Sequence, residues 1–258
     1  MPVLEISQQD RVLRLTLNRP DKRHALSHEL SSALVAAFAR AASEPAVGAI
    51  LLDATGPAFC AGMDLEDASS ASAVERTAIH EQLFTLRTTL RKPLIAAVNG
   101  PALGGGLGLA AQAHIVIAAQ GATFGLPEIR LAMWPFFIWR SVTAALGERR
   151  TLEMALTGRI FGSNEAAQYG LVHEVVPPIE LDDRATAVAE LVSQYSPFTL
   201  ERGLSLAAQS RELSDSETLA LAARLRAEVF ASPDFHEGVT ALQQKRRPVW
   251  PSISYPKE

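Results

Sequence analysis

The chain has 258 residues, of which 48% are hydrophobic and 20% charged, and its formal net charge at pH 7 is −4. This composition predicts a globular protein with one large domain, or one domain and an appendage, and argues against extensive disorder. Charges of both signs are mixed along the chain, so it lacks the basic stripe that neutralises a nucleic-acid backbone, and we expect no nucleic-acid partner.

Cys60 is the single cysteine, which excludes an internal disulfide framework and a multi-cysteine metal site, and we expect no metal. A lone thiol fits a reducing compartment, and the first residues lack the basic start and continuous apolar run of a secretory signal. We therefore expect a cytoplasmic protein. The uncharged span 93–127 is interrupted by Asn99, Pro101 and Gln112 before a membrane helix could form, so we expect no membrane segment.

The first predicted element is a half-buried strand, because leucines at positions 13, 15 and 17 alternate with polar residues. After the turn-forming segment NRPDKRHALS, apolar residues at helical spacing predict a helix from the N-cap Ser27 to about Ser43. Three short apolar runs, separated by helical stretches, indicate buried strands of an α/β domain at 47–53, 94–98 and 114–119.

The strand pattern stops at Pro177 and Pro178, and a helical region follows. We divide the chain into a core domain, residues 1–195, and a C-terminal helical region, residues 196–258. The helices are predicted at 184–194, 198–209, 217–230 and 235–245. Beyond residue 196 the apolar side chains exceed what short helices can bury by themselves, which predicts an oligomer. They include Leu200, Leu204, Leu219, Leu221, Leu225 and Phe230.

Two glycine-bearing segments are similar in sequence and form a weak internal repeat: VGAILLDATGPAFCAGMDL at 47–65 and PLIAAVNGPALGGGLGL at 93–109. Such a repeat predicts neighbouring turns of a coiled stack. Glycines between a buried strand and a helix let the backbone approach a ligand and direct free N–H groups outward, but they also fit a simple tight turn. The second copy favours a site, because two such turns can donate two N–H groups to one oxygen, as an oxyanion hole requires.

Six segments, in the family's order, resemble the crotonase superfamily of enoyl-CoA hydratases and isomerases. They are NRPDKRHALS (18–27), AFCAGMDL (58–65), AAVNGPALGGGLGLA (96–110), FGLPEIRLAMWP (124–135), ALTGRIFGSNEAAQYGLVHEVVP (155–177) and EGVTALQQKRRPVW (237–250). The resemblance implies a crotonase-type ββα spiral core with a C-terminal helical trimerisation region. It also implies a homotrimer or homohexamer that binds an acyl-CoA thioester, with coenzyme A as part of the substrate and no separate cofactor.

The resemblance also implies roles for individual residues. In the family the thioester oxygen lies between two backbone N–H groups that stabilise an enolate, and the motifs assign these to Met63 and Gly105. Positions matching the family's CoA and acyl contacts are Arg23, Ala25, Leu26, Ala61, Gly62, Gly108 and Trp134, with Phe235 and Lys245 often supplied by a neighbouring subunit. Met63 would also fit an ordinary core, and Arg23 and the basic run around Lys245 would also fit solvated surface charges.

Hydratases of this family hold water between two glutamates, and this sequence retains one of them. Glu128 in FGLPE matches the second glutamate, while Gly108 replaces the first. Apolar neighbours are expected to raise the pKa of Glu128 toward that of a working acid or base. One carboxylate suffices to move a proton between two carbons. Together with the bulky run MWPFFIW at 133–139, this favours a 3-enoyl-CoA to 2-enoyl-CoA isomerase.

Two alternatives stay open at this point. One is an enoyl-CoA hydratase, including one for aromatic or unusual acyl groups, since single-glutamate hydratases occur in the family. The other is a non-catalytic acyl-CoA-binding protein on the same scaffold. If MWPFFIW leaves space beside position 108, the change Gly108→Glu is expected to restore a second carboxylate and to increase hydration.

Overall fold

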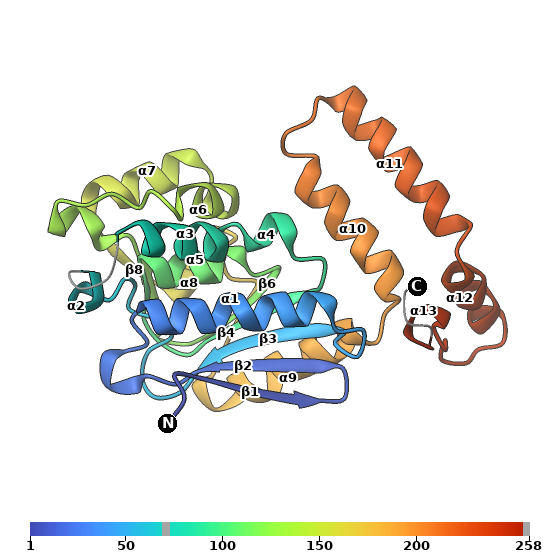
Figure 1. Ribbon diagram of the computed structural model, residues 1–258, viewed down its shortest axis with the longest axis horizontal. Coiled ribbons are helices and arrows are strands. Elements are labelled where there is room, and N and C mark those ends of the chain that lie inside the picture. The colour runs from blue at the N-terminus through green and yellow to red at the C-terminus, as the bar shows by residue number, and fades with distance from the viewer. Residues whose placement is uncertain (69–72, 255–258) are drawn as a thin grey trace.

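Residues 1–68 and 73–254 are described by the computed structural model (Figure 1). A six-stranded sheet has the order β1-β2-β3-β4-β6-β9; its β1–β2 pair is antiparallel and its other pairs are parallel. A three-stranded sheet has the order β5-β7-β8. The strands are β1 (Leu4–Gln9), β2 (Val12–Leu17), β3 (Ala49–Ala54), β4 (Leu94–Val98), β5 (Ala102–Leu103), β6 (Ile115–Ala119), β7 (Thr123–Gly125), β8 (Ile160–Gly162) and β9 (Glu174–Val176).

The predicted strands β2, β3, β4 and β6 are confirmed, and the last three read as continuous apolar runs because both faces of the sheet are covered. Helix α9 (Leu181–Ser193) contributes Leu181, Ala185 and Ala189 to the cluster on one face, which includes Leu51 of β3. On the other face, helices α1 (His28–Ser43) and α5 (Gly105–Gln112) join the larger core cluster. Alternate residues of β3, β4 and β6 therefore enter opposite clusters.

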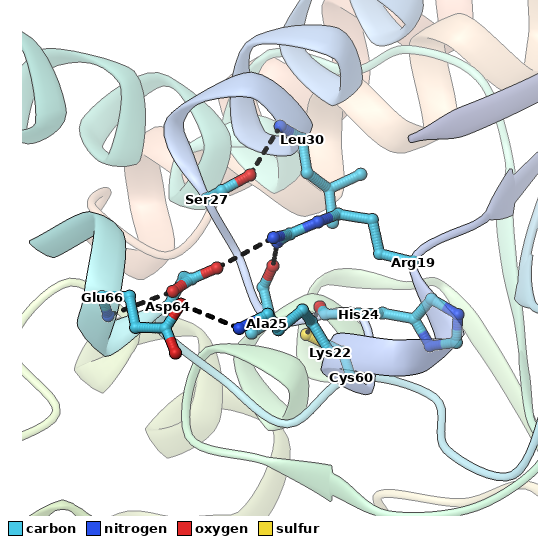
Figure 2. Close-up of polar contacts among 9 residues, drawn as sticks. All are labelled: Arg19, Lys22, His24, Ala25, Ser27, Leu30, Cys60, Asp64 and Glu66. Carbon is cyan, nitrogen blue, oxygen red and sulfur yellow. Dashed lines mark hydrogen bonds and ion pairs between the residues drawn. The ribbon is translucent and has the colours of Figure 1, made fainter. Parts of the chain in front are cut away.

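Helix α1 begins where the sequence predicts. The Ser27 hydroxyl accepts a hydrogen bond from the backbone N–H of Leu30, an N-cap that satisfies one of the first free amides of the helix (Figure 2). The other elements of the core are η1 (Pro20–Lys22), α2 (Leu65–Ala68), α3 (Ala73–Phe84), α4 (Leu86–Thr89), η2 (Pro127–Leu131), α6 (Trp139–Leu146), α7 (Glu148–Thr157), α8 (Ser163–Gln168) and η3 (Pro178–Glu180).

The C-terminal helices extend away from the sheet (Figure 1). They are α10 (Pro197–Gln209), α11 (Asp215–Phe230), α12 (Pro233–Gln243) and α13 (Pro251–Ser254). This agrees with the predicted helical region, although the division into two domains at residues 195 and 196 stays a prediction. The described residues include no helix that combines the length and apolar character needed to cross a membrane.

The apolar residues predicted to face a partner do not behave alike. Leu221 and Leu225 are buried within the single chain, so they need no partner. Leu219 is 71% exposed and Phe230 is 45% exposed, while Leu200 and Leu204 are half-buried. The unburied surface of this region is therefore smaller than the sequence suggested.

Candidate active site

The two repeated segments lie side by side. Their strands β3 and β4 pair in parallel, and beyond the strands the contact continues through a parallel bridge between Cys60 and Ala102. The N–H of Leu103 donates to the carbonyl of Cys60 at 2.9 Å. A β-carbon at Gly106 would lie 2.1 Å from that same carbonyl oxygen, so only glycine allows α5 to approach this closely. The two repeated segments thus place the second glycine turn in direct contact with the first.

The backbone N–H groups of Met63 and Gly105 are both left free by this arrangement. Leu26 donates to the carbonyl of Gly62 at 2.7 Å and accepts from Asp64 at 3.2 Å, so the N–H of the intervening Met63 points away from this pairing. Gly105 is the first residue of α5, where a helix has no internal acceptor for an N–H. Neither group donates to another atom among the described residues.

Met63 and Gly105 both line one cavity, which has a volume of about 180 Å³. The two loops are in contact there, since a β-carbon at Gly62 would lie 3.5 Å from the nitrogen of Gly105. The cavity is mainly apolar and aromatic. Its lining residues are Leu26, Ala61, Gly62, Met63, Leu65, His80, Phe84, Gly104, Gly105, Pro127, Glu128, Leu131, Met133, Trp134, Pro135, Phe136, Phe137 and Ile138.

Glu128 reaches this cavity from the first turn of η2 and lies against the glycine loop. Gly104 has φ +53° and ψ −119°, a conformation that favours glycine, and a β-carbon there would lie 2.9 Å from Oε1 of Glu128. The Oε2 atom is buried and has no hydrogen-bond partner among the described residues. Burial raises the pKa of the Glu128 carboxyl, and a smaller opposing effect comes from its own backbone N–H. The expected direction of the pKa shift is therefore confirmed.

Gly108 is not among the residues that line the cavity, and its predicted contact with the substrate stays a prediction. A β-carbon at this buried position would lie 2.3 Å from Cγ2 and 2.8 Å from Cβ of Ile138, and 3.1 Å from Cε1 of Phe84. Ile138 belongs to the run MWPFFIW, which leaves no space beside position 108. The change Gly108→Glu would displace Ile138 instead of placing a carboxylate in an open cavity.

The first loop is joined to the second by main-chain and ionic contacts. The carbonyl of Arg23 accepts from Ala61 at 2.9 Å. The guanidinium of Arg19 donates to the carbonyl of Ala25 at 2.6 Å and pairs with the buried Asp64 at 3.0 Å (Figure 2). The side chain of Arg23 is exposed, and neither Arg23 nor Ala25 is part of the cavity lining, whereas the predicted contacts Leu26, Ala61, Gly62 and Trp134 are.

Residues 7–252 match the family model described as Enoyl-CoA hydratase/isomerase. The chain belongs to this family. It is 35% identical over 250 residues to 2,3-dehydroadipyl-CoA hydratase of Escherichia coli K12, covering 96% of this chain and 98% of that protein. It is 36% identical over 247 residues to a probable mitochondrial enoyl-CoA hydratase of Dictyostelium discoideum, covering 94% and 88%.

Solved structures agree with this assignment. The crystal structure of an enoyl-CoA hydratase of Mycobacterium smegmatis matches with a TM-score of 0.91 and 30% identity, covering 97% of this chain and 99% of that one. One from Bacillus anthracis matches with a TM-score of 0.91 and 27% identity, covering 97% and 99%. The predicted crotonase-type α/β fold is thereby confirmed, and the protein is an acyl-CoA enzyme of the enoyl-CoA hydratase/isomerase family.

Two of the contacts that the family resemblance implies lie outside the cavity of the single chain. Phe235 is in α12, where its ring stacks on that of Phe230 with centroids 4.7 Å apart, and Lys245 is exposed just after the same helix. Neither residue lines the cavity, and α12 lies at the far end of the C-terminal region (Figure 1). The contact of either residue with CoA bound to another copy of the chain, which the resemblance implies, stays a prediction.

The sequence analysis missed the residues that helix α3 contributes. His80 and Phe84 line the cavity one turn apart, and the ring of His80 lies 5.8 Å from that of Phe137 in a T-shaped arrangement. Their spacing of four residues is a weak signal, because any amphipathic helix shows it. Arg19 was also missed. A single arginine before a turn does not indicate that its side chain will contact Ala25 and Asp64.

Proposed function

We propose that this family member is a single-carboxylate isomerase that converts 3-enoyl-CoA to 2-enoyl-CoA. The observation that carries the proposal is the lining of the cavity: Glu128 supplies the one carboxylate found there in the described part of the chain. At Gly108, where a second carboxylate would have to arise, Ile138 and Phe84 fill the space.

The proposed reaction needs one proton carrier and two hydrogen-bond donors. Glu128 removes a proton from C2, and the electrons of that C–H bond move toward the thioester carbonyl. The enolate oxygen accepts hydrogen bonds from the N–H groups of Met63 and Gly105. The protonated carboxyl then returns the proton to C4 while the double bond moves from C3–C4 to C2–C3. Atoms balance without a cofactor, because coenzyme A is part of the substrate.

The two N–H groups and the raised pKa have complementary effects. Preorganised donors stabilise developing negative charge, and losing one typically lowers kcat by about 10²- to 10³-fold. A carboxyl with a raised pKa holds a transferred proton more firmly than an ordinary surface glutamate does. The cavity therefore supports both halves of an enolate mechanism with groups that are already in place.

A second candidate function is hydration of a 2-enoyl-CoA. It is favoured by the names of the relatives, since those from Escherichia coli and Dictyostelium discoideum are both called hydratases. In this chain a nucleophilic water would have to be oriented by Glu128 without a second carboxylate beside it.

The test gives the purified enzyme 3-hexenoyl-CoA and 2-hexenoyl-CoA in separate assays. A short, uncharged acyl group suits a cavity of about 180 Å³ whose lining includes no Lys or Arg in the described residues. We expect rapid formation of the 2-enoyl thioester, which is measured by its absorbance. We also expect little 3-hydroxyhexanoyl-CoA, which is measured by chromatography. Fast hydration without isomerisation would assign the enzyme to the hydratase branch instead.

The proposed active form is a homotrimer or a homohexamer. Two observations support it: Phe235 and Lys245 lie away from the cavity of their own chain, and Leu219 and Phe230 expose apolar surface on α11. Sedimentation velocity at micromolar concentration is expected to give the mass of three or six chains. A monomer under these conditions would contradict the proposal.

A further inference from the structure

Ile138 forms the wall of the cavity between helix α5 and the substrate space. It is 3% exposed, it lines the cavity, and its side chain meets the position that a β-carbon of Gly108 would occupy. Phe84 contacts the same wall, since its ring lies 3.1 Å from that position. Two apolar side chains thus cover one side of the site.

This wall lies beside the carboxyl of Glu128. The N–H of Gly108 donates to the carbonyl of the N-cap Gly104 at 3.0 Å, so the two glycines are separated by the first turn of α5. The Glu128 carboxyl occupies the space in front of Gly104, and Ile138 occupies the space in front of Gly108. Ile138 and Glu128 therefore line the same cavity from neighbouring positions along the first turn of α5.

The backbone holds Ile138 firmly in this place. It is the N-cap residue of α6, and its carbonyl accepts hydrogen bonds from the N–H of Val142 at 3.0 Å and from the hydroxyl of Ser141 at 2.9 Å. Val142 is fully buried, which anchors this first turn in the core. A β-branched side chain also has restricted rotation about χ1. These contacts fix the backbone of Ile138 at the start of α6.

We propose that Ile138 is the residue that excludes water from the Glu128 carboxyl, and that it thereby determines the outcome of the reaction. With Ile138 in place, the proton taken from C2 stays on the carboxyl until it is returned to C4 of the same substrate. Without it, water reaches the carboxyl, so the proton exchanges with solvent and water can add to the product. This inference rests on the proposed isomerase function.

The experiment uses 3-hexenoyl-CoA carrying two deuterium atoms at C2, in ordinary water, with the full-length enzyme. One deuterium is removed in the reaction, and mass spectrometry and NMR measure how much of it appears at C4 of the 2-enoyl product. The wild type is expected to retain deuterium at C4. Ile138→Ala is expected to lose most of that retention and to form more 3-hydroxyacyl product.

Two further variants make the result specific. Ile138→Val keeps the Cγ2 methyl that faces Gly108 and is expected to retain deuterium as the wild type does. Val142→Ala removes a comparable part of the α6 core without opening the cavity, and it should also retain deuterium. Equal retention in Ile138→Ala and the wild type, or no retention in the wild type, would overturn the inference while isomerisation persists. Absence of isomerisation in the wild type would instead overturn the proposed function.

Discussion

Replacing Glu128 with glutamine is expected to lower kcat for isomerisation by about 10²- to 10⁴-fold, the usual effect of removing a general acid or base. Glutamine has nearly the same size and can still occupy the space in front of Gly104, but it cannot carry the proton from C2 to C4. Affinity for the CoA ester should change little, because the two N–H groups and the apolar walls remain. Stopped-flow absorbance gives kcat, and calorimetry with hexanoyl-CoA gives Kd.

The matched control is Glu180→Gln, which makes the same chemical change at an exposed position in η3. This variant should keep the kcat of the wild type. A Glu128→Gln enzyme that also keeps it would remove Glu128 from the reaction, and the enolate mechanism would then need another base.

The pH dependence of the wild type measures the same group in a different way. Glu128 must be ionised to remove a proton, and burial raises its pKa above the value of about 4.3 that a free glutamate shows. As the pH is lowered, Glu128 therefore becomes protonated at a higher pH than an ordinary glutamate would. The value of kcat/KM should start to fall at this higher pH. His80 is the other titratable side chain lining the cavity in the described part of the chain. In His80→Asn this acid limb should persist.

The change Gly106→Ala is expected to reduce both stability and activity. The added β-carbon would lie 2.1 Å from the carbonyl oxygen and 2.8 Å from the carbonyl carbon of Cys60, and a backbone group cannot move aside as a side chain end can. Overpacking of this kind lowers the free energy of unfolding by about 1–3 kcal/mol or more. The shift of α5 would also move the N–H of Gly105 from its place in the proposed oxyanion hole. Urea unfolding and the isomerisation assay measure the two effects.

Gly203→Ala is the control for this substitution. Gly203 also lies in a helix, α10, but a β-carbon there would meet no atom within 4 Å. Alanine is the better helix former by roughly 0.5–1 kcal/mol, so this variant should be more stable than the wild type. The same chemical change is thus expected to have opposite signs at the two positions. A Gly106→Ala protein as stable as the wild type would show that α5 does not need its close contact with Cys60.

Much of the framework was predictable because its signals are local. The alternating leucines of β2, the apolar run of β4 and the N-cap Ser27 each express a preference of a few neighbouring residues, and the structure confirms all three. The glycine turns were also predictable, because glycines that follow a strand are visible in the sequence itself. Glu128 was also identified from the sequence, because it is the one family glutamate that the recognised motifs retain.

The sequence by itself therefore determined the family, the order of four strands of the main sheet and the identity of the single candidate base. The tertiary structure decided what surrounds that base. Ile138 fills the space at Gly108, Phe84 comes from α3, and Arg19 ties the first loop to Asp64. These contacts join residues distant in the chain, and their distances depend on how helices and loops pack. Packing is a property of the whole fold, so no local pattern could show that the place of a second carboxylate is occupied.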